Sequence, residues 1–173
     1  MTGSLLLNAF HQSNAALLTY TVGGDPNKET SLEIFREIAR SGADIIECGL
    51  GHGANIGDGG AVQDGTYRAL SNGIKTDDVF DIIKTLRDEF DTNVIIMTYQ
   101  NKIMSYGEDN FLSKCVESKV AGIICVDWPW PLNLNFAAKC KKNNIDFIQL
   151  LCPTTNEERL KLILNDAHDV VYY

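Results

Sequence analysis

Residues 44–49 read Asp-Ile-Ile-Glu-Cys-Gly, a short apolar run that carries one carboxylate near its end. Six runs of this kind, rich in apolar and β-branched residues, recur along the chain, at residues 16–21, 44–48, 93–98, 122–126, 146–151 and 169–173. Most of them are continuously apolar rather than alternating, which is typical of parallel strands buried on both faces. The sequence therefore predicts six buried strands.

Helical patterns separate the six runs. Apolar stripes at helical spacing cross residues 32–39 and 79–90. Thr76 predicts the N-cap of the second of these helices, and Thr155 with Glu158 predicts a capping box at the start of another helix. Strands and helices alternate without interruption, which indicates βαβ units and a parallel sheet.

Two α/β architectures compete for this pattern. A doubly wound sheet needs a phosphate-binding glycine turn after its first strand, and residues 22–26, Val-Gly-Gly-Asp-Pro, are not a G-x-G-x-x-G motif. A barrel places its chemistry where several strands end. Polar residues do cluster there: Asp25, Glu47, Tyr99, Asn101, Asp127 and Tyr173. We therefore predict a (β/α)8 TIM barrel.

The length of the chain is short for such a barrel. A complete eight-stranded barrel takes about 250 residues, whereas this chain has 173 and ends within its sixth predicted strand. Six strands cannot close and leave open edges. We expect residues 1–173 to form a single (β/α)-barrel domain, present only through about the sixth strand, with the C-terminal part of the barrel absent. We also expect the chain to be a fragment of a longer protein.

Composition narrows the class of protein. The net charge of -8 argues against a nucleic-acid partner, which requires a basic face. No apolar stretch approaches the length of a membrane span, and the first ten residues do not resemble a secretory signal. The five cysteines are an odd number at irregular spacing without a CxxC pair, so neither a disulfide framework nor a metal site is predicted. This pattern of cysteines favours a location of the protein in the reducing cytoplasm.

Glu47 is the sharpest candidate for chemistry. Its carboxylate comes at the C-terminal end of an otherwise apolar strand, where the active site of a barrel is built. Burial raises the pKa of such a carboxyl group and allows it to exchange a proton near neutral pH. The alternative is a structural ion pair with a buried Arg or Lys of a neighbouring strand. No Arg or Lys occurs in any of the six runs, so catalysis is the favoured interpretation.

Asp58 follows Glu47 by eleven residues, within a stretch from Gly49 to Gly60 that contains six glycines. A segment so rich in glycine can act as a mobile lid that brings Asp58 to Glu47, giving two carboxylates in different environments. The alternative is a plain connection with an Asp-Gly turn. His52, in the same stretch, is either a proton carrier or a solvent-facing loop residue, and the second is favoured.

Trp128 and Trp130 follow the fourth predicted strand. They either frame a flat aromatic substrate or anchor the packing beside Pro129 and Pro131, and packing is slightly favoured.

The sequence resembles the tryptophan synthase alpha chain family along essentially its whole length. The matching stretches are residues 18–21, 24–26, 42–49, 58–59, 62–63, 67–70, 97–99, 106–107, 152–155 and 158–160, with Asn101, Asp127 and Pro129. The resemblance implies a lyase that splits indole-3-glycerol phosphate into indole and glyceraldehyde 3-phosphate in tryptophan biosynthesis. It also implies no cofactor in this chain and an α2β2 assembly, in which indole passes to a pyridoxal-phosphate beta chain.

The resemblance also assigns roles to individual residues. Glu47 corresponds to the general acid/base, and Asp58 to the carboxylate that steadies the indole nitrogen as it loses its proton. The substrate-binding positions that it implies are Tyr20, Met97, Tyr99, Asp127 and Tyr173.

The sequence departs from the family in the lid. Residues 51–55 read Gly-His-Gly-Ala-Asn where the family usually has Pro-Phe-Ser-Asp-Pro, and Gly60 replaces a proline. Extra glycine raises the entropy that is lost when a loop orders, so we expect weaker coupling to a beta chain. The family's phosphate-binding loops follow the last strands and are not in this chain. Two alternatives therefore remain: a non-catalytic relative that at most binds a partner, and a different phosphate-binding barrel enzyme.

Overall fold

A parallel sheet that follows the order of the chain organises the computed structural model, which describes residues 5–11 and 15–173. Five strands form it in the order β1 (Leu18–Val22), β2 (Ile45–Gly49), β3 (Asn93–Thr98), β4 (Gly122–Cys125) and β5 (Asp146–Phe147). A second parallel pair joins β6 (Gln149–Leu150) to β7 (Val171–Tyr172). In a doubly wound sheet the strand order reverses at a switch point. The strands here pair consecutively, as they do in a barrel.

Each of the six predicted runs contains a strand, and the fifth contains two. Its first residues, β5, pair with β4, and its last residues, β6, pair with β7. Ile148, between them, still donates its backbone N–H to the carbonyl oxygen of Ile123 at 2.9 Å. The fifth predicted strand therefore pairs with the fourth through its first residues and with the sixth through its last residues.

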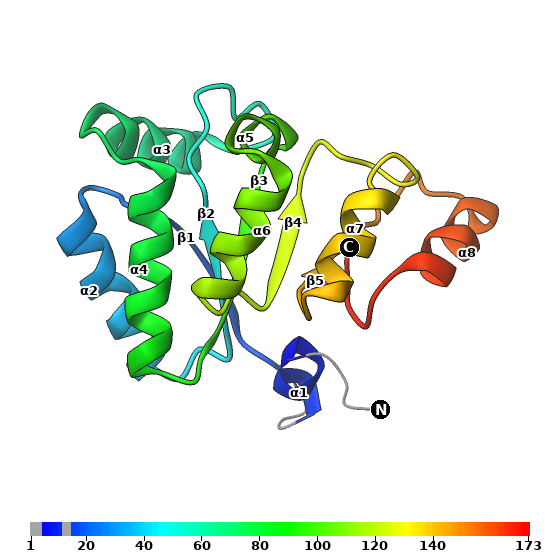
Figure 1. Cartoon of the computed structure of the whole chain (residues 1–173), viewed down its shortest axis with the longest axis horizontal. Coiled ribbons are helices and arrows are strands. Elements are labelled where there is room, and N and C mark those ends of the chain that lie inside the picture. The colour runs from blue at the N-terminus through cyan, green and yellow to red at the C-terminus, as the bar shows by residue number, and fades with distance from the viewer. Residues whose placement is uncertain (1–4, 12–14) are drawn as a thin grey trace.

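Helices connect the strands on the outer side of the sheet, where α2, α4 and α6 pack side by side (Figure 1). The helices are α1 (Leu5–His11), α2 (Lys28–Arg40), α3 (Gly60–Ser71), α4 (Thr76–Glu89), α5 (Gln100–Tyr106), α6 (Glu108–Glu117), α7 (Leu134–Lys142) and α8 (Glu157–Asp166). Within residues 5–11 and 15–173, no helix is both long and apolar enough to cross a membrane.

Two apolar clusters lie on the two faces of the sheet. Ile46, Cys48 and Ile96 belong to the cluster beneath the helices, whereas Ile45 and Ile95 belong to a smaller one on the opposite face. Successive side chains of a strand point to opposite faces. The smaller cluster therefore marks the inner face of the barrel, and residues two positions from Ile45 and Ile95 share it.

Helix α1 covers one end of this inner face (Figure 1). Leu6 and Ala9 are buried and pack in the inner cluster with Ile45, Ile95 and Ala121. A Cβ atom on Gly122 would come within 2.9 Å of the Leu6 side chain, so the glycine gives α1 the room for its close approach to β4.

Two helix caps differ from the prediction. Thr76 is the first residue of α4 rather than its N-cap, which is Lys75, and the Asp78 carboxylate accepts a hydrogen bond from the Lys75 N–H at 3.0 Å. At α8 the N-cap is Asn156, one residue beyond the predicted Thr155. The Thr155 hydroxyl instead accepts from the Cys152 N–H at 3.1 Å, because it closes the preceding turn.

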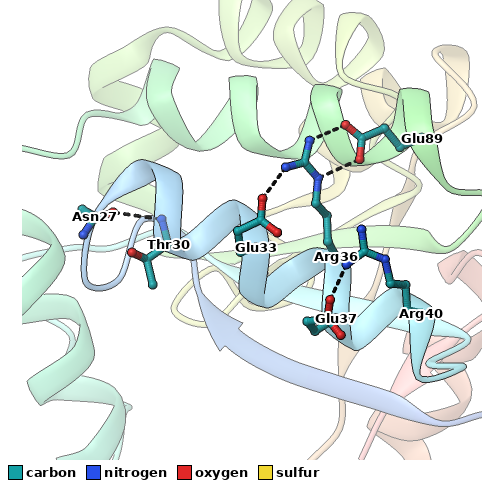
Figure 2. Close-up of polar contacts among 7 residues, drawn as sticks. All are labelled: Asn27, Thr30, Glu33, Arg36, Glu37, Arg40 and Glu89. Atoms are coloured by element: carbon teal, nitrogen blue, oxygen red, sulfur yellow. Dashed lines mark hydrogen bonds and ion pairs between the residues drawn. The ribbon is translucent and has the colours of Figure 1, made fainter.

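Polar contacts fix α2 at its N-terminus and along its outer side (Figure 2). The Asn27 side chain accepts a hydrogen bond from the Thr30 N–H at 2.9 Å, which satisfies one free donor of the first turn. Arg36 donates to both carboxylate oxygens of Glu89 on α4, and also to Glu33. These contacts hold α2 against α4 and so support the segment after β1.

Candidate active site

Glu47 is a buried carboxylic acid on the inner face of the sheet. It is 2% exposed and lies two residues beyond Ile45, in register with Tyr20 of β1 and Ile95 of β3. None of the ion pairs among the described residues involves Glu47, so the ion-pair alternative finds no support. Burial alone raises the pKa of Glu47 from 4.5 to about 7. The group is therefore able to give up or accept a proton near neutral pH.

Tyr20 is a half-buried tyrosine on β1 with both predicted carboxylates nearby. Its ring packs directly over the backbone of Gly49, where a Cβ atom would come within 2.2 Å of the Tyr20 hydroxyl. Burial raises the pKa of that hydroxyl most, and the nearby Asp58, Cys48 and Glu47 raise it further. Both predicted carboxylates therefore lie near this one hydroxyl group.

Tyr99 holds the lid loop, which we define as residues 50–59. Its hydroxyl accepts a hydrogen bond from the Gly57 N–H at 3.0 Å, and its ring lies 5.5 Å from the ring of His52. Burial raises the pKa of Tyr99 most, and Asp58 is among the nearby acids that raise it. The lid loop thus lies over the ends of the strands, and His52 is half-buried against Tyr99 rather than facing solvent.

The other predicted substrate residues have different surroundings. Met97, on β3, is half-buried beside the inner cluster. Asp127 is exposed, and its carboxylate accepts a hydrogen bond from the Gln100 N–H at 2.6 Å, the first residue of α5. Asp127 therefore fixes the start of the helix that directly follows Tyr99.

Tyr172 is a candidate that the sequence analysis missed. It is in register with Leu150, which belongs to the inner cluster, and Val170 two residues earlier belongs to it as well. Nearby Glu47 is the largest cause of the raised pKa of Tyr172. Tyr173, the predicted residue, is 81% exposed and by alternation points to the other face. The sequence signal that could have identified Tyr172 is the alternation of side chains along the strand, counted forward from Val170.

The two tryptophans pack in the outer layer, which is the interpretation that the sequence slightly favoured. Trp128 stacks on Phe136 of α7 with the ring centres 5.1 Å apart, and Trp130 donates its indole N–H to Asp166 of α8 at 2.9 Å. A cavity of about 270 Å³ lies beside them. Its lining combines Cys125 and Phe147 of the outer cluster with Ile148 and Leu150 of the inner cluster, and Glu47 is not part of it.

Comparison with known proteins gives one consistent answer. The family model for the tryptophan synthase alpha chain matches residues 6–173. The tryptophan synthase alpha chain of Pelagibacter ubique is 50% identical over 163 residues, and that of Petrotoga mobilis is 38% identical over 161 residues. These matches cover 94% and 93% of this chain and 61% and 62% of the relatives. The chain thus spans about three fifths of the length of these curated relatives.

Solved structures agree with this match. A tryptophan synthase alpha chain from Legionella pneumophila superposes with a TM-score of 0.90 at 30% identity, covering 99% of this chain and 66% of that one. A chain of the Pyrococcus furiosus tryptophan synthase complex gives a TM-score of 0.83 at 35% identity, covering 88% of this chain and 63% of the other. The predicted TIM-barrel fold class, present in part, is confirmed. The chain belongs to the tryptophan synthase alpha chain family.

Proposed function

We propose that this chain carries the acid/base site of a carbon–carbon lyase that cleaves indole-3-glycerol phosphate into indole and glyceraldehyde 3-phosphate in tryptophan biosynthesis. The observation that carries the proposal is Glu47, a carboxyl group 2% exposed on the inner face of the sheet, with a pKa raised to about 7. Asp58 lies close to the same Tyr20 hydroxyl and supplies a second carboxylate. Membership of the family supports the same reaction.

The chemistry requires proton transfers at indole C3, at the ring nitrogen and at the hydroxyl group of the carbon that is cleaved. Protonated Glu47 donates its proton to indole C3, and Asp58 stabilises the ring N–H as that proton leaves. The now ionised Glu47 takes the proton of the hydroxyl group on the carbon that is cleaved, the electron pair of the C–C bond returns to the indole ring, and the ring nitrogen regains its proton, so the products are indole and the aldehyde glyceraldehyde 3-phosphate. Two carboxyl groups in different surroundings suit these separate roles, because Glu47 must begin protonated and the other group must begin ionised.

The remaining positions shape the substrate pocket. We propose that Tyr20, Met97 and Tyr99 contact the substrate, and that Asp127 contributes from the start of α5. Tyr173 stays a prediction that nothing in its present surroundings supports. Tyr172 takes the inward position next to Glu47, so we propose it as a further contact.

A beta chain is the partner that the family relationship favours. A solved relative from Pyrococcus furiosus is described as part of a tryptophan synthase a2b2 complex. We propose that this chain enters such an assembly in the cytoplasm, with residues 1–173 as one barrel domain and no cofactor of its own. All five cysteines are free thiols, which supports a reducing compartment. Because of its changed residues 51–55, we propose weaker coupling to the beta chain.

Indole release from indole-3-glycerol phosphate tests the proposed reaction. The parent chain is compared with Glu47→Gln, Asp58→Asn and the control Glu29→Gln, which changes an exposed residue of α2. We expect Glu47→Gln to lower the rate by about 100-fold or more, the usual contribution of a general acid, and Glu29→Gln to leave it unchanged. Equal rates for the parent and Glu47→Gln, or no indole from either in a chain extended to the length of its curated relatives, would contradict the lyase and favour the non-catalytic relative.

A further inference from the structure

We propose that His52, Gly57 and Tyr99 form a latch that holds the lid loop over the strand ends and thereby positions Asp58 for the reaction. We call these three residues the Tyr99 latch. The inference deepens the proposed function and rests on it, because the positioned group is one of its two carboxylates. In this account His52 and Gly57 are positioning residues that act through Asp58.

The first half of the latch is the contact between Gly57 and Tyr99. The Gly57 N–H donates to the Tyr99 hydroxyl at 3.0 Å. A Cβ atom at residue 57 would lie 3.1 Å from that hydroxyl and 3.2 Å from the side chain of Val126. Both distances are tighter than packed carbon atoms ordinarily accept. Glycine is therefore what allows the backbone of the lid loop to approach the ends of β3 and β4 so closely.

The neighbours of Gly57 have little room to yield. Tyr99 is 5% exposed, and it is followed directly by α5, whose first N–H is held by Asp127. Val126 is tied to the neighbouring strand, because its N–H donates to the carbonyl oxygen of Thr98 at 3.0 Å. A methyl group on residue 57 would therefore displace the lid loop rather than its neighbours.

The second half of the latch is the ring of His52 against the same tyrosine. The ring centres lie 5.5 Å apart at 39°, within the range of favourable aromatic pairs. His52 stands in the segment where this sequence departs from the usual family pattern and has gained glycine on both sides. Because glycine makes the free loop more disordered, an added ring contact offsets part of the ordering cost.

The latch acts on Asp58 through the shortest connection available, the next peptide unit. The Asp58 N–H donates to the carbonyl oxygen of Asn55 at 3.1 Å, and its carbonyl oxygen accepts from the Gln63 side chain of α3 at 2.8 Å. Asp58 is thus held between a latched glycine and the helix that follows. Its carboxylate lies near the hydroxyl groups of Tyr20 and Tyr99 as a result.

Hydrogen–deuterium exchange of the lid loop tests the latch without any substrate. Gly57→Ala is compared with Gly53→Ala, a matched change in the same loop where a Cβ atom meets nothing within 4 Å. Loss of one hydrogen bond or its equivalent raises exchange by about threefold to tenfold. We expect this increase in residues 52–58 for Gly57→Ala and for Tyr99→Phe, and no more than about twofold for Gly53→Ala. Equal exchange for Gly57→Ala and Gly53→Ala would overturn the proposal.

A rescue experiment separates ring packing from proton transfer at residue 52. His52→Ala is expected to raise exchange of the lid loop and to lower kcat for indole release, whereas His52→Phe, which carries no proton, restores both. Failure of His52→Phe to restore the protection would contradict the packing role. The two proposals fail separately. Altered exchange, with no indole from a parent extended to the length of its curated relatives, leaves the latch and removes the lyase. Normal indole release with unaltered exchange leaves the lyase and removes the latch.

Discussion

At the scale of single residues, the proposed chemistry depends on where one carboxyl group is buried. Glu47 stands on the inner face between Tyr20 and Ile95, without an ion-pair partner among the described residues. The desolvation of its charged form is therefore not offset, and its pKa rises to about 7. A residue kept in this state costs stability, which is typical of a functional position.

The stability cost of burying Glu47 depends on pH, and this dependence leads to a prediction. The pKa of Glu47 is 4.5 when the chain is unfolded and about 7 when it is folded, so the folded state holds the proton more strongly. Its contribution to stability is full below pH 4.5 and is lost as the pH rises through 7. We expect the difference in unfolding free energy between the parent and Glu47→Gln to change by roughly 3 kcal/mol over this range. Urea unfolding at several pH values measures it, and a constant difference would contradict the assignment.

The sequence singled out Glu47 from residue types alone, because a carboxylate in a strand without cations is conspicuous. For Asp58 the glycine-rich surroundings left a lid and a plain Asp-Gly turn open, and its role came from the family resemblance. Tyr173 stays a prediction, and the alternation of the last strand, which places Tyr172 inward, adds Tyr172 as a further candidate. The contact of His52 with Tyr99 joins residues 47 positions apart, and no local pattern encodes it.

At the scale of elements, the strands follow from composition and the caps do not. The runs at 93–98 and 122–126 match β3 and β4 closely because a buried parallel strand is apolar throughout. The N-cap of α8 is Asn156 rather than the predicted Thr155. Two neighbouring side chains compete for backbone N–H donors there, and the turn geometry decides between them.

The cap of α2 provides a prediction at this scale. Asn27 accepts from the Thr30 N–H, so Asn27→Ala leaves that donor to solvent and lowers the unfolding free energy by about 1 kcal/mol. Asn27→Asp retains an acceptor and is expected to cost much less. Thermal or urea unfolding of the two variants makes the comparison. Equal losses for both variants would show that the cap is not what stabilises this end of α2.

At the scale of the whole molecule, the consecutive order of the strands indicates the barrel. The ladder runs from β1 to β5 and is carried on by β6 to β7, and the inner face so formed is covered at one end by α1 (Figure 1). The order was predictable because βαβ units repeat without interruption. The position of α1 was not predictable from the sequence, because helix–sheet contacts between distant segments depend on the assembled inner face.

The packing of α1 also leads to a prediction. Leu6 is 1% exposed within the inner cluster, so Leu6→Ala removes buried contacts and leaves a cavity. We expect a loss of about 3 kcal/mol in unfolding free energy. The control Asn8→Ala changes an exposed residue of the same helix and is expected to stay within about 0.5 kcal/mol. Similar small effects for both variants would show that α1 does not contribute to the core.

The protonation state of Glu47 is the central claim, and its titration tests that claim most directly. Carbon-13 NMR of the side-chain carboxyl groups follows each glutamate as the pH is raised, and Glu47→Gln identifies the resonance by its loss. The structure predicts that the resonance lost in Glu47→Gln titrates near pH 7. If the resonance lost in Glu47→Gln titrates below pH 5, Glu47 is ionised at neutral pH, and the proton that the proposed reaction requires is not there.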